Sequence, residues 1–346
     1  GGGGATVLVQ ETKPDEATQL EGTLWFRSST ADMFCLYEDT DSKQWVKIAC
    51  SLPQAELATT GFKNQIINGD FRIQQRGSGG TGSGFHIDRW RGYNNQTLSI
   101  GIDPADNQNY LNIHVDSGSG SYPAAGTYLE LDEQGRPAPF LKGSTWTYSG
   151  EVWVDDTDVW SYAWLVFTNS SSGGNSQVIY DSESANDGQQ ELLTPSVWTP
   201  FSFTFNVGVD PHANNLAVEV YAGVRKAAGV TNGSNVRLKN LQLERGGVAT
   251  PFERRPIQQE LALCQRYYWS NSGSPSDSGI GTRYPTGITA HRVSHTWPVE
   301  MRVPPTITNA VNSSGGNPTV VHVSKYGIGR IDFGSAETTL NITLDA

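Results

Sequence analysis

Two stretches of the chain alternate strictly between apolar and polar residues, and this alternation limits the possible fold more than any other feature. Thr145-Trp-Thr-Tyr-Ser-Gly-Glu-Val-Trp-Val154 and Phe201-Ser-Phe-Thr-Phe-Asn-Val207 carry aromatic or apolar side chains at nearly every second position. In an extended strand such residues share one face, so each stretch is typical of a half-buried β-strand. The sequence therefore predicts an all-β protein.

Short apolar runs, separated by loops rich in Ser, Gly, Asn and Asp, recur across residues 62–256. Nine such runs without an internal repeat favour a jelly-roll β-sandwich over a propeller. The glycine-rich segment Gly77–Gly84 has no Lys and no helix after it, so we expect a flexible loop there rather than a phosphate site. The expected strands are Gln65–Ile67, Leu98–Ile102, Tyr110–Val115, Thr127–Leu131, Trp146–Val154, Tyr162–Thr168, Phe201–Val207, Leu216–Ala222 and Val236–Leu243.

Residues 1–61 predict a small β-meander with strands at Gly22–Phe26, Met33–Tyr37 and Gln44–Ile48, then a linker or single helical turn at Ser51–Gly61. A sheet this short buries little by itself, so we expect three copies to associate as a homotrimer.

Residues 257–346 predict one connecting helix and a smaller β-sandwich. The helix is expected over Ile257–Tyr268, because Leu261, Cys264 and Tyr268 fall on one face. The strands that follow are expected at Ile288–Val293, Val299–Val303, Thr319–Val323, Ile328–Phe333 and Leu340–Leu344.

The charge and the cysteines exclude several classes of protein. The net charge of -11 disfavours binding to nucleic acid or to an anionic bilayer, and no apolar run is long enough to span a membrane. Cys35, Cys50 and Cys264 form neither a disulfide framework nor a zinc site; Cys35 and Cys50 either pair across a hairpin or stay as thiols, as in a reducing cytoplasm. With no initiator Met and four glycines at its start, the chain is expected to be a piece of a longer one.

We find no catalytic pattern and expect no enzyme. There is no Gly-x-Ser-x-Gly motif, and no two histidines lie at metal-binding spacing on the expected helix. The densest acidic groups, Asp155–Asp158 and Asp181–Asp187, lie in turn-like segments, whereas a glycosidase needs a protonated carboxyl facing a second one.

Aromatic side chains are the candidates for binding sugar rings by stacking. Trp160 follows an acidic turn and Tyr122 lies in a Gly/Ser loop, so we expect both to be exposed; Tyr284 and Trp297 flank loops near the C-terminus. Trp153 and Trp164 lie within apolar strands and are expected in the core. The other aromatic residues considered are Tyr93, Tyr180, Trp198 and Trp269.

Several motifs, in order along the chain, resemble bacteriophage tail fibres. Gly22–Phe26, Leu36-Tyr37 and Gln44-Trp45-Val46 resemble a short module of these fibres. The opening of their carbohydrate-binding-module-like domain is similar to Asn64–Gly77 and Asp88-Arg-Trp90, and its close to Leu241–Gly246, Ala249–Glu253 and Leu261–Tyr268. Pro298–Thr306 is similar to the first strand of their C-terminal sandwich.

The resemblance implies a trimeric tail-fibre segment of the virion that attaches to a host surface glycan. It also implies other tail or baseplate proteins as partners at the N-terminal side, and assembly in the host cytoplasm. Sandwiches of the carbohydrate-binding type often hold a structural calcium, for which Asn68, Asp70 and Glu244 would be oxygen ligands; no other cofactor is expected. Two alternatives stay open: a virion structural protein (baseplate or decoration) without receptor binding, and a polysaccharide-degrading tailspike.

Overall fold

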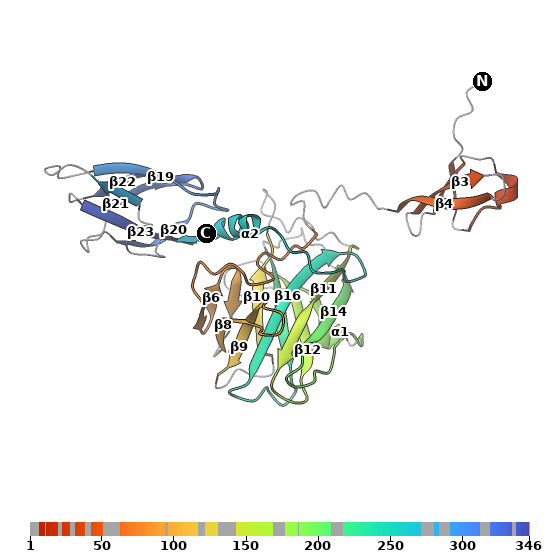
Figure 1. Ribbon diagram of the computed structural model, residues 1–346, viewed down its shortest axis with the longest axis horizontal. Helices are drawn as coiled ribbons and strands as arrows, with labels where there is room; N and C mark the ends of the chain where they lie inside the picture. The colour runs from red at the N-terminus through yellow and green to blue at the C-terminus, as the bar shows by residue number, and fades with distance from the viewer. Residues whose placement is uncertain are drawn as a thin grey trace, which may run out of the picture. The chain divides into compact units, whose positions relative to one another are not determined.

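A computed structural model covers the chain and divides it into two compact units, Gly1–Phe62 and Lys63–Ala346 (Figure 1). The structure describes residues 7–10, 12–19, 23–27, 32–38, 43–50, 63–93, 96–116, 122–130, 143–168, 177–185, 187–208, 217–270, 280–283, 291–311, 319–333 and 337–345. The expected linker Ser51–Gly61 lies outside these residues.

The first unit is one four-stranded sheet in the order β1-β2-β3-β4. The predicted meander is confirmed as β2 (Leu24–Arg27), β3 (Asp32–Glu38) and β4 (Lys43–Cys50). A further strand, β1 (Val7–Val9), pairs in parallel with β2, and a short 3-10 helix, η1, spans Glu16–Thr18.

The two cysteines of this unit do not face each other. The register places Cys35 opposite Val46 and Cys50 opposite Asp32, and Cys35 is a free thiol. A disulfide across the hairpin would need the two residues to be cross-strand neighbours. Of the two alternatives left open for this pair, the geometry favours the thiols.

The larger part of the second unit is a sandwich of two antiparallel six-stranded sheets, which confirms the predicted jelly-roll class. The chain passes repeatedly from one sheet to the other (Figure 1). The first sheet has the order β13-β12-β15-β10-β7-β6, with β6 Gly84–Ile87, β7 Trp90–Gly92, β10 Ala124–Tyr128, β12 Trp160–Thr168, β13 Gln177–Asp181 and β15 Ala217–Arg225. The second has the order β14-β11-β16-β9-β8-β5, with β5 Gly79–Thr81, β8 Gln96–Ile102, β9 Asn109–Val115, β11 Thr145–Val154, β14 Thr199–Asn206 and β16 Asn235–Arg245.

The core lies between the two sheets and follows the alternation seen in the sequence. In β11, Trp146, Tyr148 and Val152 point inward and are buried, and in β14 the three phenylalanines do the same. The facing strand β15 contributes Val218, Val220, Ala222 and Val224. Burying each large apolar side chain stabilises the fold by about 1.5–3 kcal/mol.

Two predictions near the start of the sandwich are wrong. Gln65–Ile67 is not a strand: its backbone bonds to the Asn64 side chain and to Leu243 rather than to a continuous ladder. The glycine-rich segment is not a free loop either, because it forms β5 and the start of β6. A Cβ at Gly79 would lie 2.1 Å from the carbonyl oxygen of Leu98, so these glycines let neighbouring strands approach closely.

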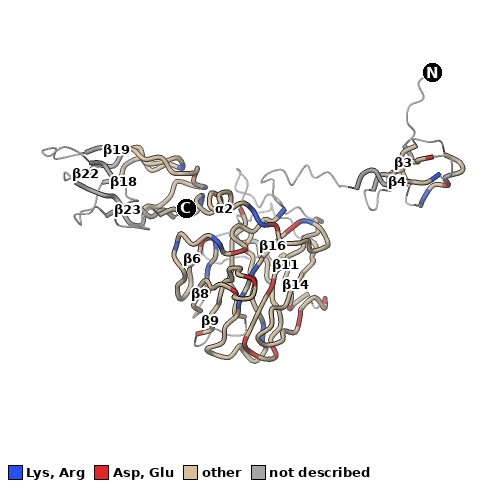
Figure 2. Tube along the Cα trace, in the orientation of Figure 1, with Lys and Arg blue, Asp and Glu red and all other residues tan. Residues whose placement is uncertain are grey.

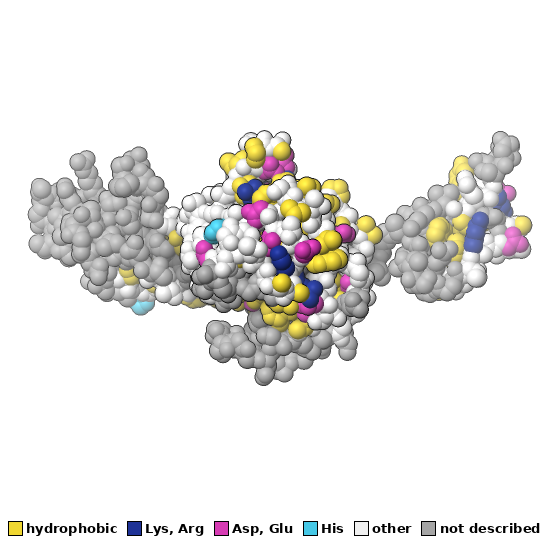
Figure 3. Space-filling model, turned by 90° about the horizontal axis from the view of Figure 1, so that it is seen from below, with side chains coloured by type: hydrophobic (Ala, Val, Ile, Leu, Met, Phe, Trp, Pro, Cys, Tyr) yellow, Lys and Arg dark blue, Asp and Glu magenta, His cyan; other side chains and the backbone are white. Residues whose placement is uncertain are grey.

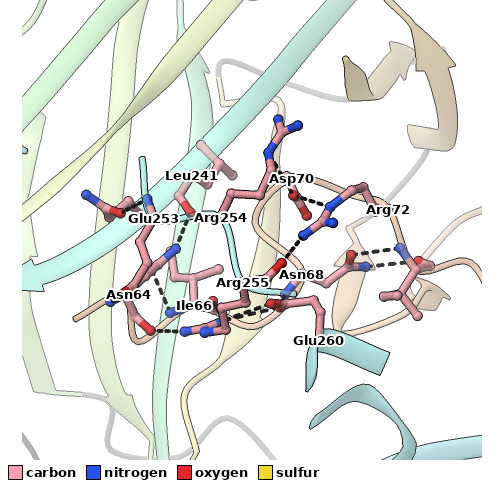
Figure 4. A network of polar contacts seen from close by, with 12 residues as sticks. Asn64, Ile66, Asn68, Asp70, Arg72, Leu241, Glu253, Arg254, Arg255 and Glu260 are labelled. Atoms are coloured by element: carbon pink, nitrogen blue, oxygen red, sulfur yellow. Dashed lines mark hydrogen bonds and ion pairs between the residues drawn. The ribbon is translucent and has the colours of Figure 1, made fainter. Parts of the chain in front are cut away.

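A buried ion pair joins the opening segment of the sandwich to its closing segment and to helix α2 (Ile257–Gln265), as Figure 4 shows. Arg255 lies 3.2 Å from the Glu260 carboxylate, and both side chains are 4% exposed. Arg255 also donates to the backbone oxygens of Asn64 and Ile66, while Glu260 accepts from the amide of Asn68. Motifs at the two ends of the domain therefore meet at one polar latch, consisting of Arg255 and Glu260 with these backbone groups.

After α2 the chain forms two small sheets. The first pairs β17 (Tyr268–Ser270), β18 (Ile280–Arg283) and β20 (Thr306–Val311) with β23 (Glu337–Asp345); the second has the order β19-β22-β21, with β19 His291–Thr296, β21 Thr319–Val323 and β22 Gly327–Phe333. The helix expected over Ile257–Tyr268 forms from its first residue but is three residues shorter, because α2 ends at Gln265 and Tyr268 already belongs to β17.

The expected strand Val299–Val303 is wrong. Its amides bond to separate segments, since Met301 donates to Lys325 and Arg302 donates to Arg266, so no continuous ladder forms. Prolines at 298, 304 and 305 also remove the donors that a strand would need. The resemblance of this stretch to the first strand of a C-terminal sandwich is therefore not matched by strand structure.

Charged residues of both signs are interspersed along the sandwich strands rather than gathered by sign (Figure 2). Within the described ranges, no helix is both long and apolar enough to cross a bilayer.

Candidate functional site

The outward face of the first six-stranded sheet is rich in aromatic residues, and the alternation of β12 explains why. Ser161, Ala163 and Leu165 point into the core, so Trp160, Tyr162 and Trp164 point outward. Residues paired across strands share a face, and Trp164 is paired with Tyr221 of β15. Small side chains thus fill the interior here, and large aromatic ones lie on the outside.

Four half-buried aromatic residues form a row across this sheet, and we call Trp164, Tyr221, Tyr93 and Tyr128 the aromatic row. The ring centroids of Trp164 and Tyr221 are 4.9 Å apart, and those of Tyr221 and Tyr93 are also 4.9 Å apart. The Arg91 guanidinium lies 4.7 Å from the centre of the Tyr93 ring and donates to the Tyr128 hydroxyl at 2.8 Å. The row therefore runs across neighbouring strands with a cation stacked among its rings.

Gly126 of β10 makes room for this arrangement. A Cβ at this position would lie 2.6 Å from the Tyr93 hydroxyl oxygen. Tyr93 can lie over the strand only because residue 126 has no side chain, so this glycine helps to set the shape of the row.

A carboxylate is buried beneath the row. Glu219 is 4% exposed, accepts a hydrogen bond from the Tyr93 hydroxyl and lies 3.5 Å from Arg91. Burial, and then the charge of Glu219, raise the pKa of both Tyr93 and Tyr221. Their hydroxyls therefore remain protonated at neutral pH and keep their hydrogens for donation.

A second group lies at the β12–β15 end of the same face. The rings of Tyr122 and Tyr162 are 5.1 Å apart, the Tyr122 hydroxyl donates to Glu183, and Glu183 forms an ion pair with Arg225. The hydrogen bond to Glu183 raises the pKa of Tyr122. Tyr122 is 44% exposed and Trp160 38%, so both are accessible as predicted.

The face offers what a sugar ring needs. Flat aromatic surfaces stack on the ring, while hydroxyl, carboxylate and guanidinium groups between them exchange hydrogen bonds with sugar hydroxyls. The visible surface of the sandwich in Figure 3 mixes apolar, acidic and basic side chains without a large patch of one sign.

The structure places the other predicted aromatic residues elsewhere. Trp297 is only 6% exposed, donates its indole N–H to the Ser324 backbone and packs against Trp269 and His295. Little of its ring is left for a ligand. Tyr284 lies outside the described residues, and Tyr180 is buried in the core.

The predicted calcium ligands are all engaged by protein groups. Asn68 accepts from the Ile73 amide and donates to two backbone oxygens, Asp70 binds Arg72, and Glu244 accepts from the amide and hydroxyl of Thr250. Among the residues that the structure describes, no group of three or more His, Cys, Asp or Glu side chains is placed to hold a metal. The calcium site stays a prediction.

Sequence reasoning missed the residues that make up most of the face. Trp164 was expected in the core, and so was Trp153, which is half-buried on the outward side of the other sheet because Val152 and Val154 occupy the inward side. Tyr221, Tyr128, Arg91 and Glu219 were not considered. The signal was present in the Trp160-Ser-Tyr-Ala-Trp164 alternation, where the small residues mark the inward side.

Comparisons with known proteins give no family. No family model matches the chain, and no curated protein matches it. Among solved structures, the CBM22-2 xylan-binding domain of Paenibacillus barcinonensis Xyn10C is similar with a TM-score of 0.36 and 15% identity, over 54% of this chain and 99% of that one. A putative sugar binding protein from Bacteroides thetaiotaomicron has a TM-score of 0.35 and 12% identity, over 53% of this chain and 100% of that one.

The enzymatically active domain of tailspike protein 4 of bacteriophage CBA120 is also similar, with a TM-score of 0.32 and 10% identity, over 53% of this chain but 21% of that one. At identities and scores this low, the similarity says nothing about what this chain binds.

Proposed function

We propose that the chain is a segment of a bacteriophage tail fibre that attaches the virion to its host by binding a surface glycan on the outward face of the first sheet. The motifs that resemble tail fibres support the setting. The aromatic row, with Arg91 and Glu219 between and beneath its rings, is the observation that carries the binding role. The chain acts as a homotrimer, with tail or baseplate proteins bound at its N-terminal side.

The charges of the face favour a neutral glycan. Arg91 lies beside Glu219, and Arg225 forms an ion pair with Glu183, so each of these two guanidinium groups already has a carboxylate partner. An acidic sugar would have to compete with these carboxylates for a cation, whereas a neutral sugar needs only hydroxyl contacts.

The same contacts support a role without catalysis. Hydrolysis of a glycosidic bond needs two carboxyl groups that face each other across the bond, one of them protonated. On this face Glu219 and Glu183 are each bound to a different arginine and to a different tyrosine. We therefore propose a binding protein rather than a glycosidase.

The test measures binding of the purified chain to host cells and to polysaccharide extracted from their surface. It compares the parent with variants that lack one side chain of the aromatic row. Trp164→Ala and Tyr221→Ala each remove one stacking surface. Each substitution should weaken binding about tenfold, because a stacked aromatic contact contributes roughly 1.4 kcal/mol.

Trp153→Ala is the matched control. Trp153 is a half-buried tryptophan of the other sheet, where it stacks on Arg237 at 3.8 Å, so its removal costs similar packing but leaves the row intact. Equal loss in all three variants would refute the assigned face. Absence of any binding would favour the structural virion protein, and release of oligosaccharide would favour the tailspike.

A further inference from the structure

One residue from each of five neighbouring strands lies on a single line across the outward face of the first sheet. In the register, Trp164 of β12 pairs with Tyr221 of β15, and Tyr221 pairs with Gly126 of β10. Gly126 pairs in turn with Arg91 of β7, and Arg91 pairs with Phe85 of β6. Residues paired directly across strands share a face and lie side by side. We call these five residues the register line.

Phe85 belongs to the outward face because of a bulge in β6. Ile87 of the same strand is fully buried in the core, so regular alternation would turn Phe85 inward as well. The register shifts between these two residues and places Phe85 opposite Arg91, while Ile87 lies opposite the buried Trp90. Phe85 is half-buried and packs against Tyr128, with 6.1 Å between the ring centroids. The register line therefore extends beyond the aromatic row to the edge strand β6.

A flat side chain lies at every strand of the register line, because the Tyr93 ring fills the space above Gly126. The successive distances between centres are 4.9, 4.9, 4.7 and 6.0 Å along Trp164, Tyr221, Tyr93, the Arg91 guanidinium and Phe85. All five side chains are half-buried, so each keeps part of its surface open to solvent. The line is thus a continuous series of flat groups at nearly regular spacing.

This spacing suits an extended polymer better than a single sugar. Neighbouring strands lie about 4.8 Å apart, so the four steps from β12 to β6 span about 19 Å. One residue of an extended polysaccharide covers about the same length as one strand spacing, so a run of about five residues would contact the whole line. A single sugar ring would leave most of these groups unused.

Resting on the proposed function, we infer that the chain binds the interior of an extended polysaccharide, as a run of about five sugar residues laid across the strands from β12 to β6. Consecutive residues of the polysaccharide meet consecutive flat groups, which stack on the sugar rings. Affinity therefore depends on the length of the run and not on either of its ends.

The length dependence of binding tests this inference. Host surface polysaccharide is partly hydrolysed and separated by size, and fragments of about two to about eight residues are titrated into the full chain by calorimetry. Affinity should rise about tenfold between fragments of about two and about five residues and change little beyond that length, because the line then offers no further group. Reduction of the terminal sugar of the longest fragment to its alditol should leave its affinity unchanged.

Phe85→Ala removes the β6 end of the line, which the aromatic row does not include. It should weaken binding of long fragments severalfold and should leave the affinity for fragments of about two residues unchanged, because these still find the other groups. Phe252→Ala is the matched control, since Phe252 is also a half-buried phenylalanine but lines a groove on the other sheet with Ser149 and Ser202. The control should keep the affinity of the parent at every length, and circular dichroism verifies the fold of both variants.

Two results would overturn the inference: fragments of about two residues that bind as tightly as the longest ones, or a Phe85→Ala protein that keeps the affinity of the parent for long fragments. Weaker binding by Trp164→Ala alongside either result would still support the proposed face, so the two failures are distinguishable. A parent that binds neither a fragment nor the intact polysaccharide would overturn both proposals.

Discussion

Breaking the polar latch between the ends of the sandwich should lower the stability of the second unit by several kcal/mol. Glu260→Gln removes the charge that faces Arg255, whose guanidinium is 4% exposed and lies 3.2 Å from both carboxylate oxygens. Removing one partner of a buried ion pair costs about 3–5 kcal/mol, because the other charge stays buried without compensation. At about 2–4 °C per kcal/mol for a domain of this size, the melting midpoint of the second unit should fall by about 6–20 °C.

Calorimetry measures this shift, and two further variants show whether it comes from the buried charge. Lys325→Gln breaks the exposed Lys325–Glu300 pair, 2.8 Å long, and should leave the midpoint unchanged. Arg255→Met/Glu260→Leu replaces the buried pair by apolar groups and should lie closer to the parent than Glu260→Gln does. A Glu260→Gln protein that melts within 2 °C of the parent would refute the reasoning.

Three further experiments have defined outcomes. Gly126→Ala should displace Tyr93 and weaken glycan binding severalfold in a titration, whereas Gly101→Ala, whose Cβ would meet Tyr110 on the other sheet, should not. Burial acts to raise the pKa of Asp156, but hydrogen bonds from the Thr231 amide and Lys226 lower it to about 2, below the ordinary 3.8. Its contribution of about 2 kcal/mol to stability is therefore complete above about pH 5 and lost as the pH falls toward 2. Acid unfolding of Asp156→Asn should lack this component. Burial raises the pKa of the Cys264 thiol, so Cys264 should resist alkylation until the protein unfolds, as mass spectrometry would detect.

The sandwich strands were predictable where one face is buried and the other is exposed to solvent. β11 and β14 alternate clearly because most of their outward residues are polar, and the sequence therefore shows the register; Trp153 of β11 is an outward exception. Elements that depend on distant partners were not predictable. β1 exists only by pairing with β2, and the stretch at 299–303 bonds to Lys325 and Arg266, contacts that no local pattern records.

The candidate site was harder to predict than the fold, because aromatic residues within strands usually belong to the core. In β12 the opposite holds, since Ala163 and Leu165 occupy the interior and leave Trp164 outside. Tyr93 can join the row only because Gly126, on the neighbouring strand, has no side chain to displace it. No local sequence pattern indicates this contact between distant residues. The exposure of Trp160 and Tyr122 could be predicted, because a neighbouring acidic turn and a Gly/Ser loop indicate exposed segments from the local sequence alone.

A crystal structure of the chain with an oligosaccharide from the host surface tests the binding face most directly. Sugar rings should lie on Trp164, Tyr221 and Tyr93, with hydroxyls bonded to Arg91 or to the Tyr122 group. Sugar bound to the outward face of the other sheet, or to the C-terminal sheets alone, would contradict the assignment.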